Sequence, residues 1–165
     1  MIFASVGSML PFDRFVKGVD EWAGKNPQEE VLIQIGDGEY EPVNAPWVRI
    51  MPHSEYRDRL QQCALFVAHV GIGSILQAIE NHKQMLLLPR LAALREHTTD
   101  HQLHTATRFK DLASVLIVDD VPQLQAAITR LLANPLPSTD TIAPYAPESM
   151  IQKVAEFLNA GSKPN

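Results

Sequence analysis

The feature that most constrains this chain is the alternation of short apolar runs with longer amphipathic stretches. Runs such as Ile2–Val6 and Leu65–Ala68 have the length and composition of buried strands. Between such runs, Phe12–Lys25 places its apolar residues on one face of a helix. Strands that alternate with helices form a parallel sheet covered on both faces. The sequence therefore predicts an α/β protein with a Rossmann-like, doubly wound parallel sheet of about six strands.

The same pattern assigns most of the chain to elements of a single domain over residues 1–160. The expected strands are Ile2–Val6, Val31–Ile35, Trp47–Met51, Leu65–Ala68, Met85–Leu88 and Val115–Val118. The expected helices are Phe12–Lys25, Ser54–Gln62, Ser74–His82, Thr99–Phe109, Pro122–Ala133 and Glu148–Asn159. The proline-rich segment Asn134–Pro147 is expected to be a loop, and residues 161–165 a frayed tail.

Composition and charge exclude several classes of protein. With 45% hydrophobic and 20% charged residues, the chain has the balance of a soluble globular domain. Its net charge of -5 argues against nucleic acid as a partner, because phosphate binding needs clustered basic residues. Cys63 is the only cysteine, which fits a reducing cytoplasm. The sequence has no apolar stretch of roughly 18 residues, and Met1–Val6 lacks the pattern of a signal peptide.

Ligands of doubly wound folds bind at the carboxyl ends of the strands, so the loops there are the candidate sites. They are Gly7–Pro11, Gly36–Tyr40, Met51–His53, His69–Gly73 and Pro89–His97.

The loop His69-Val70-Gly71-Ile72-Gly73-Ser74 lies between an expected strand and an expected helix. Its glycines let the backbone approach a ligand, and the start of the helix offers free N–H groups and a positive dipole end. The loop is therefore a candidate anion site that suits a pyrophosphate. The alternative is that Ser74 only caps the helix, with Gln77 completing a capping box.

The segment from Arg90 to Gln102 is dense in polar residues after an apolar strand. Its arginines could meet phosphate, and its polar residues at the helix start could bind sugar hydroxyls. The alternative is a second capping box formed by Thr99 and Gln102. A further alternative is a metal site, because His97, His101 and His104 have a spacing that could place them on one helix face.

Several segments, taken in order, point to one family. They read MIFASVGS, PFDR, IQIGDGEYEP, AHVGIGSILQAIENHK, LLLPR and REHTTDHQ. Together they resemble the C-terminal domain of glycosyltransferase family 28, from about Met1 to Ala133. The chain most resembles stand-alone copies of that domain. These are the small catalytic subunit of the eukaryotic two-chain enzyme that adds the second N-acetylglucosamine to dolichol-linked sugar, and bacterial counterparts from capsule and exopolysaccharide clusters.

The resemblance implies a site for a UDP-sugar donor, and it implies roles for the residues that match the family motifs. Gly7 and Ser8 match the first glycine-rich loop, which approaches the diphosphate. Gly71, Gly73 and Ser74 match the diphosphate-binding turn.

Further residues match the parts of the family site around the nucleoside and the sugar. Met51 and His53 fall in a loop that packs on uracil, and Asp100 and Gln102 match the motif that reaches the donor sugar. Gln77 stands where family members usually carry an acidic residue that binds the ribose hydroxyls. Its amide carbonyl can accept one hydrogen bond but carries no charge.

The resemblance also implies a mechanism. Family members are GT-B enzymes, in which two Rossmann-like domains face a cleft and the C-terminal one holds the donor. The chain corresponds to the donor half, and the departing UDP would be stabilised by helix N-termini, with Arg90 as a further candidate. His69 and Glu96 match residues typical of the stand-alone subunits. No metal or other cofactor is expected, and the general base is expected on a partner.

That partner would be a membrane-anchored, acceptor-binding subunit holding a lipid-linked saccharide. The pair would transfer a sugar with inversion in polysaccharide or glycolipid assembly. The chain itself would be cytoplasmic and peripheral at the inner membrane face.

One other class of function stays open, and two more are disfavoured. A non-catalytic UDP-sugar-binding or regulatory module is motivated by Gln77. A dinucleotide-dependent dehydrogenase is disfavoured because Val6-Gly7-Ser8 is not G-x-G-x-x-G, and a sugar epimerase would need a second domain. The sequence leaves the transferred sugar open among N-acetylglucosamine, galactose, glucose and glucuronic acid.

Overall fold

A single parallel sheet organises the computed structural model, which describes residues 1–141 and 148–160. Its strands are β1 (Ile2–Ser5), β2 (Val31–Gln34), β3 (Trp47–Val48), β4 (Leu65–His69), β5 (Met85–Leu88) and β6 (Val115–Ile117). They are ordered β3-β2-β1-β4-β5-β6, and all neighbours are parallel. This is the strand order of Rossmann folds, so the predicted doubly wound sheet is confirmed.

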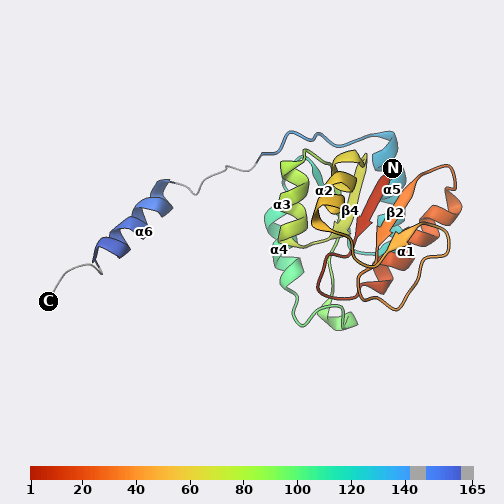
Figure 1. The fold of residues 1–165 in the computed structure, drawn as a ribbon, viewed down its shortest axis with the longest axis horizontal. Coiled ribbons are helices and arrows are strands. Elements are labelled where there is room, and N and C mark those ends of the chain that lie inside the picture. Colours follow the sequence, from red (N-terminus) through yellow and green to blue (C-terminus); the bar gives the residue numbers. More distant parts are fainter. Residues whose placement is uncertain (142–147, 161–165) are drawn as a thin grey trace.

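Helices cover both faces of the sheet (Figure 1). They are α1 (Asp13–Lys25), α2 (His53–Gln62), α3 (Ile72–Glu80), α4 (His101–Phe109) and α5 (Val121–Ala133). The chain also forms a short 3-10 turn, η1 (Ala92–Leu94), and a last helix, α6 (Glu148–Ala160). One apolar cluster joins α1 and α5 to one face of the sheet. A second cluster joins α2, α3 and α4 to the other face. The alternation of strand and helix patterns in the sequence therefore correctly predicted a sheet with helices on both faces.

Alternating side chains explain why both faces are apolar. Ile2 and Ala4 of β1 belong to the cluster with α1 and α5, whereas Phe3 between them belongs to the other cluster. Successive side chains of a strand point to opposite faces, so a central strand covered on both sides must be apolar throughout. The uninterrupted apolar runs in the sequence follow from this burial.

The two capping boxes considered as alternatives in the sequence do not form. Helix α3 begins at Ile72 with Gly71 at its N-cap, so Ser74 lies inside the first turn. Helix α4 has Asp100 at its N-cap, and neither helix has a side-chain cap hydrogen bond. The amide of Gln102 instead takes partners from other segments of the chain. By contrast, α5 has a side-chain cap at Asp120, since the backbone N–H of Gln123 donates to its Oδ1 at 2.8 Å.

Asp20 on α1 holds the loop that leads from β2 to β3. Its buried carboxylate accepts hydrogen bonds from the backbone N–H groups of Val43, Asn44 and Ala45 and from the hydroxyl of Tyr40. Burial raises the pKa of this carboxyl, but the hydrogen bonds outweigh burial and lower it. This clamp positions the segment that carries one wall of the cavity described below.

The end of the chain is described only in part. Residues 142–147 and 161–165 lie outside the described residues, so the predicted frayed tail and the second half of the predicted loop Asn134–Pro147 are not described. Helix α6 occupies the position expected from the sequence, and Met150 and Ile151 on it are exposed. Within the described ranges, no helix combines the length and apolar character needed to cross a bilayer.

Candidate functional site

A cavity of about 530 Å³ lies at the carboxyl ends of the strands. The segments that follow β1 and β4 meet there, where the order of the strands reverses. Ligands of open α/β sheets bind at this switch point, and the volume is in the range of sites for small organic ligands. The topology therefore places a ligand-sized cavity at the carboxyl ends of the strands, where the sequence predicted the binding site.

Most residues proposed from the sequence surround this cavity. It is lined by Gly7, Ser8, Met51, His53, His69, Gly71, Gly73, Ser74, Gln77, Arg90 and Gln102. It is also lined by Met9, Leu10 and His97, which lie in candidate loops but had no role assigned at the donor. Four further lining residues lie outside the candidate loops, namely Val6, Gln34, Ile50 and Tyr56. Glu96 and Asp100, which were expected at the donor, do not line it.

Gln34 is the missed residue with the clearest signal in the sequence, because it is a polar residue at the carboxyl end of an apolar strand. Its Oε1 accepts a 2.6 Å hydrogen bond from the hydroxyl of Ser5, which in turn accepts from the N–H of Gly7. This short chain ties the end of β2 to the glycine loop that follows β1. The apolar residues of the cavity wall gave no comparable signal, since apolar side chains in loops resemble ordinary core.

Two glycines hold the ring of His69 between them. Gly7 has a φ of +77°, and a Cβ at this residue would lie 2.5 Å from Nε2 of His69. A Cβ at Gly71 would lie 2.1 Å from Cε1 of the same ring. Both positions therefore exclude any larger residue as long as the ring stays in place. The glycine loops therefore leave space for the ring of His69 as well as for a ligand.

His69 in turn is held by two hydrogen-bond donors. An Nη of Arg90 lies 3.0 Å from Nδ1 of His69, and Nε2 of Gln102 lies 3.1 Å from the same atom. Burial lowers the pKa of His69 to about 3, with further contributions from the positive charges of Arg90 and His97. His69 is therefore a neutral side chain at the bottom of the cavity at physiological pH.

Arg90 carries a buried positive charge that forms no ion pair with the residues that the structure describes. The residue is 2% exposed, and its guanidinium donates to the backbone carbonyls of Val6 and Leu10 and lies over the ring of Phe12. Burial lowers its pKa to about 10, so it stays protonated at neutral pH. No carboxylate among the described residues forms an ion pair with it, and its buried Nε has no hydrogen-bond partner there.

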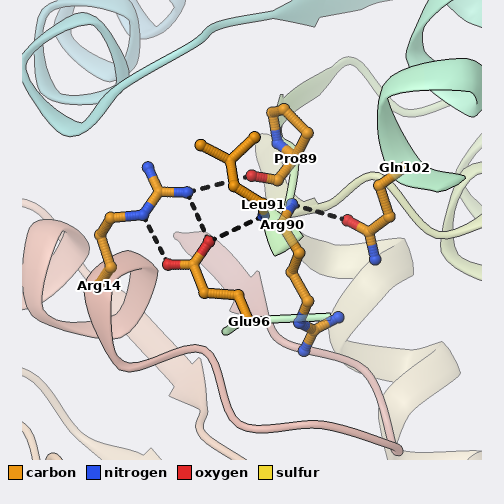
Figure 2. Close-up of polar contacts among 6 residues, drawn as sticks. All are labelled: Arg14, Pro89, Arg90, Leu91, Glu96 and Gln102. Carbon is orange, nitrogen blue, oxygen red and sulfur yellow. Dashed lines mark hydrogen bonds and ion pairs between the residues drawn. The ribbon is translucent and has the colours of Figure 1, made fainter. Parts of the chain in front are cut away.

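The loop after β5 is fastened to α1 by an ion pair, which Figure 2 shows. Arg14 donates to both carboxylate oxygens of Glu96 at 2.7 and 2.8 Å, and also to the carbonyl of Pro89. The second carboxylate oxygen of Glu96 accepts from the backbone N–H of Leu91 at 3.0 Å. Glu96 therefore anchors the loop that carries Arg90 and does not face the cavity.

Gln102 links three segments at the bottom of the cavity. Its Oε1 accepts from the backbone N–H of Arg90 at 3.0 Å and of Val70 at 3.2 Å (Figure 2 shows the first of these bonds). The side chain is 5% exposed. Asp100, two residues earlier, accepts from the backbone N–H of Ala92 and is exposed. Both residues of the predicted sugar-reading motif thus have structural partners within the chain.

The N-terminal half of α3 borders the cavity with Gly73, Ser74 and Gln77. The hydroxyl of Ser74 lies 3.4 Å from Nε2 of His69, and the amide nitrogen of Gln77 lies 3.5 Å from Nε2 of His53 on α2. A Cβ at Gly73 would meet nothing within 4 Å, so open space lies against this residue. A ligand at this end of α3 would face free backbone N–H groups and the positive end of the helix dipole.

The histidines considered as metal ligands are dispersed. His97 lines the cavity, whereas His101 and His104 are exposed on α4. Over residues 1–141 and 148–160, no three side chains of His, Cys, Asp or Glu gather in a manner that could hold a metal ion. The spacing in the sequence therefore does not translate into a cluster.

Comparison with known proteins agrees with this geometry. Residues 1–158 match the glycosyltransferase family 28 C-terminal domain. The chain belongs to this family. Because the match covers the whole layered fold together with the cavity, the family resemblance noted in the sequence is confirmed.

Solved structures with the same fold include two glycosyltransferases. The glycotransferase of kitacinnamycin is 21% identical with a TM-score of 0.62, and the alignment covers 96% of this chain and 37% of that one. The spinosyn forosaminyltransferase SpnP is 19% identical with a TM-score of 0.53, covering 81% of this chain and 35% of that one. This family 28 domain therefore spans little more than a third of either protein. Among curated proteins the comparison finds no match.

Proposed function

We propose that this family 28 domain binds a UDP-sugar and acts as the donor half of a glycosyltransferase. The observation that carries the proposal is the cation of Arg90, which is buried beside the cavity without a carboxylate partner among the described residues. A buried charge is costly unless an opposite charge approaches it. An anionic ligand in the cavity would supply that charge, and the diphosphate of a nucleotide sugar has the right sign and size.

The surroundings of Arg90 support a diphosphate in particular. The N-terminus of α3 at Ile72–Ser74 offers backbone N–H groups, and the glycine loop after β1 also borders the cavity. The lining also includes the apolar side chains of Ile50 and Met51 and the ring of Tyr56, which suit a flat base. The cavity lining thus combines groups that favour negative charge with apolar side chains that suit a ring, as a nucleoside diphosphate requires.

The proposed reaction is transfer with inversion at the anomeric carbon. The acceptor oxygen forms a bond to that carbon while the bond from the carbon to the β-phosphate oxygen breaks. The acceptor proton passes to a general base on the partner subunit, and UDP leaves with the electron pair. Negative charge grows on the diphosphate during this step, so the N-terminus of α3 and the nearby cation of Arg90 would stabilise the transition state more than the ground state. The scheme uses no metal or other cofactor.

The acceptor half is proposed to be a separate, membrane-anchored subunit that binds a lipid-linked saccharide. Support comes from the resemblance of the sequence to stand-alone copies of the domain. The assembled enzyme would work at the cytoplasmic face of the membrane in polysaccharide or glycolipid assembly.

Titration calorimetry tests the donor site. UDP should bind to the chain, and uridine should bind at least tenfold more weakly, because it lacks the diphosphate and each tenfold corresponds to about 1.4 kcal/mol. The variant Gly73→Ala is the sharpest probe, since its methyl group enters open space beside the cavity and should weaken UDP binding without loss of stability. Equal binding of uridine and UDP would contradict a diphosphate site.

Reconstitution tests the two-chain arrangement. The chain alone should transfer no sugar, and adding the product of a neighbouring gene that encodes a membrane-anchored Rossmann-like subunit should restore transfer to a lipid-linked acceptor. The alternative, a non-catalytic UDP-sugar-binding module, is favoured by the uncharged Gln77 at the cavity. UDP binding without turnover in every reconstituted pair would support that module and contradict the enzyme. Robust transfer by the single chain would contradict the separate subunit.

A further inference from the structure

The two hydrogen bonds at Nδ1 of His69 determine where its proton resides. Both partners are groups that only donate, a guanidinium Nη of Arg90 and the amide nitrogen of Gln102. The orientation of that amide is fixed independently, because its oxygen accepts from two backbone N–H groups, those of Val70 and Arg90. Two donors that converge on one imidazole nitrogen require that nitrogen to be the unprotonated acceptor.

We infer that Gln102 is a positioning residue that, together with Arg90, holds His69 as the tautomer protonated at Nε2. The inference rests on the proposed donor site, because its functional meaning is that a neutral N–H donor is fixed at the end of the cavity where the diphosphate would bind. It assigns Gln102 a task different from direct recognition of the donor sugar.

The Nε2 atom faces the parts of the site that would receive a ligand. It lies 3.4 Å from the hydroxyl of Ser74 in the first turn of α3, and next to the position that a Cβ on Gly7 would occupy. When Nε2–H donates to this hydroxyl, the oxygen of Ser74 acts as acceptor and its own hydrogen is free to turn elsewhere. The network therefore aligns donors in one direction, from Gln102 and Arg90 through His69 to Ser74.

Burial supports a single protonation state. The pKa of His69 is lowered to about 3, by burial first and then by the charges of Arg90 and His97. A histidine with this pKa stays neutral across the physiological range, so it donates one hydrogen and does not exchange protons with the substrate. The oxygen and the nitrogen of the Gln102 amide both have partners within the chain, which explains why a residue with 5% exposure keeps an amide.

Nitrogen NMR of the ¹⁵N-histidine-labelled chain measures the tautomer directly, without ligand and without activity. The signals of His69 are assigned by their loss in His69→Asn. They should show an unprotonated Nδ1 and a protonated Nε2, with no titration between about pH 5 and 8. A protonated Nδ1 in the wild-type chain, or a titration of His69 within this range, would overturn the inference.

The variant Gln102→Glu tests the role of the amide. A carboxylate keeps an acceptor for the N–H groups of Val70 and Arg90, but places a second acceptor at Nδ1 of His69. Nδ1 should then become protonated, and UDP affinity should fall about tenfold or more because the new carboxylate neutralises the charge of Arg90. An unprotonated Nδ1 in folded Gln102→Glu would show that Gln102 does not set the tautomer.

Gln84 provides a matched control for the loss of a buried amide. It is also 5% exposed, and it also links separate segments, donating to the carbonyls of Ala64 and Leu131 and accepting from the N–H of Leu136. It does not line the cavity. Gln84→Glu should cost stability but leave the His69 signals unchanged. If UDP does not bind the wild-type chain but the expected tautomer is observed, the proposed donor function is contradicted. The assignment of the proton to Nε2 of His69 is then still supported.

Discussion

Replacing Gly71 and Gly73 by alanine, one at a time, should shift the stability of the chain in opposite directions. The two glycines lie two positions apart at the start of α3 and both line the cavity. At Gly71 the new Cβ would lie 2.1 Å from Cε1, 2.7 Å from Nε2 and 2.9 Å from Nδ1 of His69. At Gly73 nothing lies within 4 Å of the new atom. The same chemical change therefore meets a fixed ring in one case and open space in the other.

The magnitudes follow from these contacts. The His69 ring cannot stay beside the methyl group that Gly71→Ala introduces, so it must leave the donors Arg90 and Gln102 at 3.0 and 3.1 Å. Losing one charged and one neutral hydrogen bond costs about 2–4 kcal/mol. For a chain of this size, each kcal/mol changes Tm by about 2–4 °C, so Gly71→Ala should lower Tm by roughly 5–15 °C. Gly73→Ala should gain up to about 1 kcal/mol from its helix propensity and raise Tm by a few degrees.

Thermal and urea unfolding of the wild-type chain and both variants, followed by circular dichroism, measures these differences. Calorimetry with UDP on the same samples separates folding from binding. Both variants should bind UDP more weakly, Gly71→Ala because His69 is displaced and Gly73→Ala because its methyl group occupies the site. Equal stability of the two variants, or a stabilised Gly71→Ala, would refute the packing argument. A stable Gly73→Ala with unchanged UDP affinity would refute the position of the diphosphate.

Four further substitutions test other contacts. Asp20→Asn should destabilise the chain by about 2–4 kcal/mol in urea unfolding at pH 7. Because the folded-state pKa of Asp20 is lowered, its contribution is present above the unfolded pKa of about 3.9 and is lost as the pH falls, so the gap between wild type and variant should narrow below about pH 4. Glu96→Gln and Arg14→Gln should weaken UDP binding to a similar extent in calorimetry, because both release the loop that carries Arg90; a loss confined to the Glu96 variant would indicate direct ligand contact. Gln34→Leu should weaken UDP binding by freeing the Gly7 loop, and full affinity would show that the chain from Gln34 through Ser5 to Gly7 is not needed.

The layered architecture could be predicted from the amino-acid pattern without any coordinates. The side chains of an apolar run such as Met85–Leu88 are all buried only where both faces of the strand are covered. In a doubly wound sheet, the helices that connect the strands cover both faces. The position of the cavity also followed, because carboxyl ends of parallel strands gather at one edge. Those inferences depend on the periodicity of apolar residues along the chain, which can be read from the sequence alone.

The roles of the polar side chains of the site became clear only in the folded chain. A local pattern made Gln102 the partner of Thr99 in a capping box, whereas its actual partners are Val70, Arg90 and His69 on neighbouring strands and loops. Glu96 likewise pairs with Arg14, which lies 82 positions away in the chain. A side chain with several possible partners takes those that the fold brings within about 3 Å in the geometry a hydrogen bond needs. That proximity arises only once the sheet is assembled, which is why spacing along the sequence predicted the place of the site but not its internal bonds.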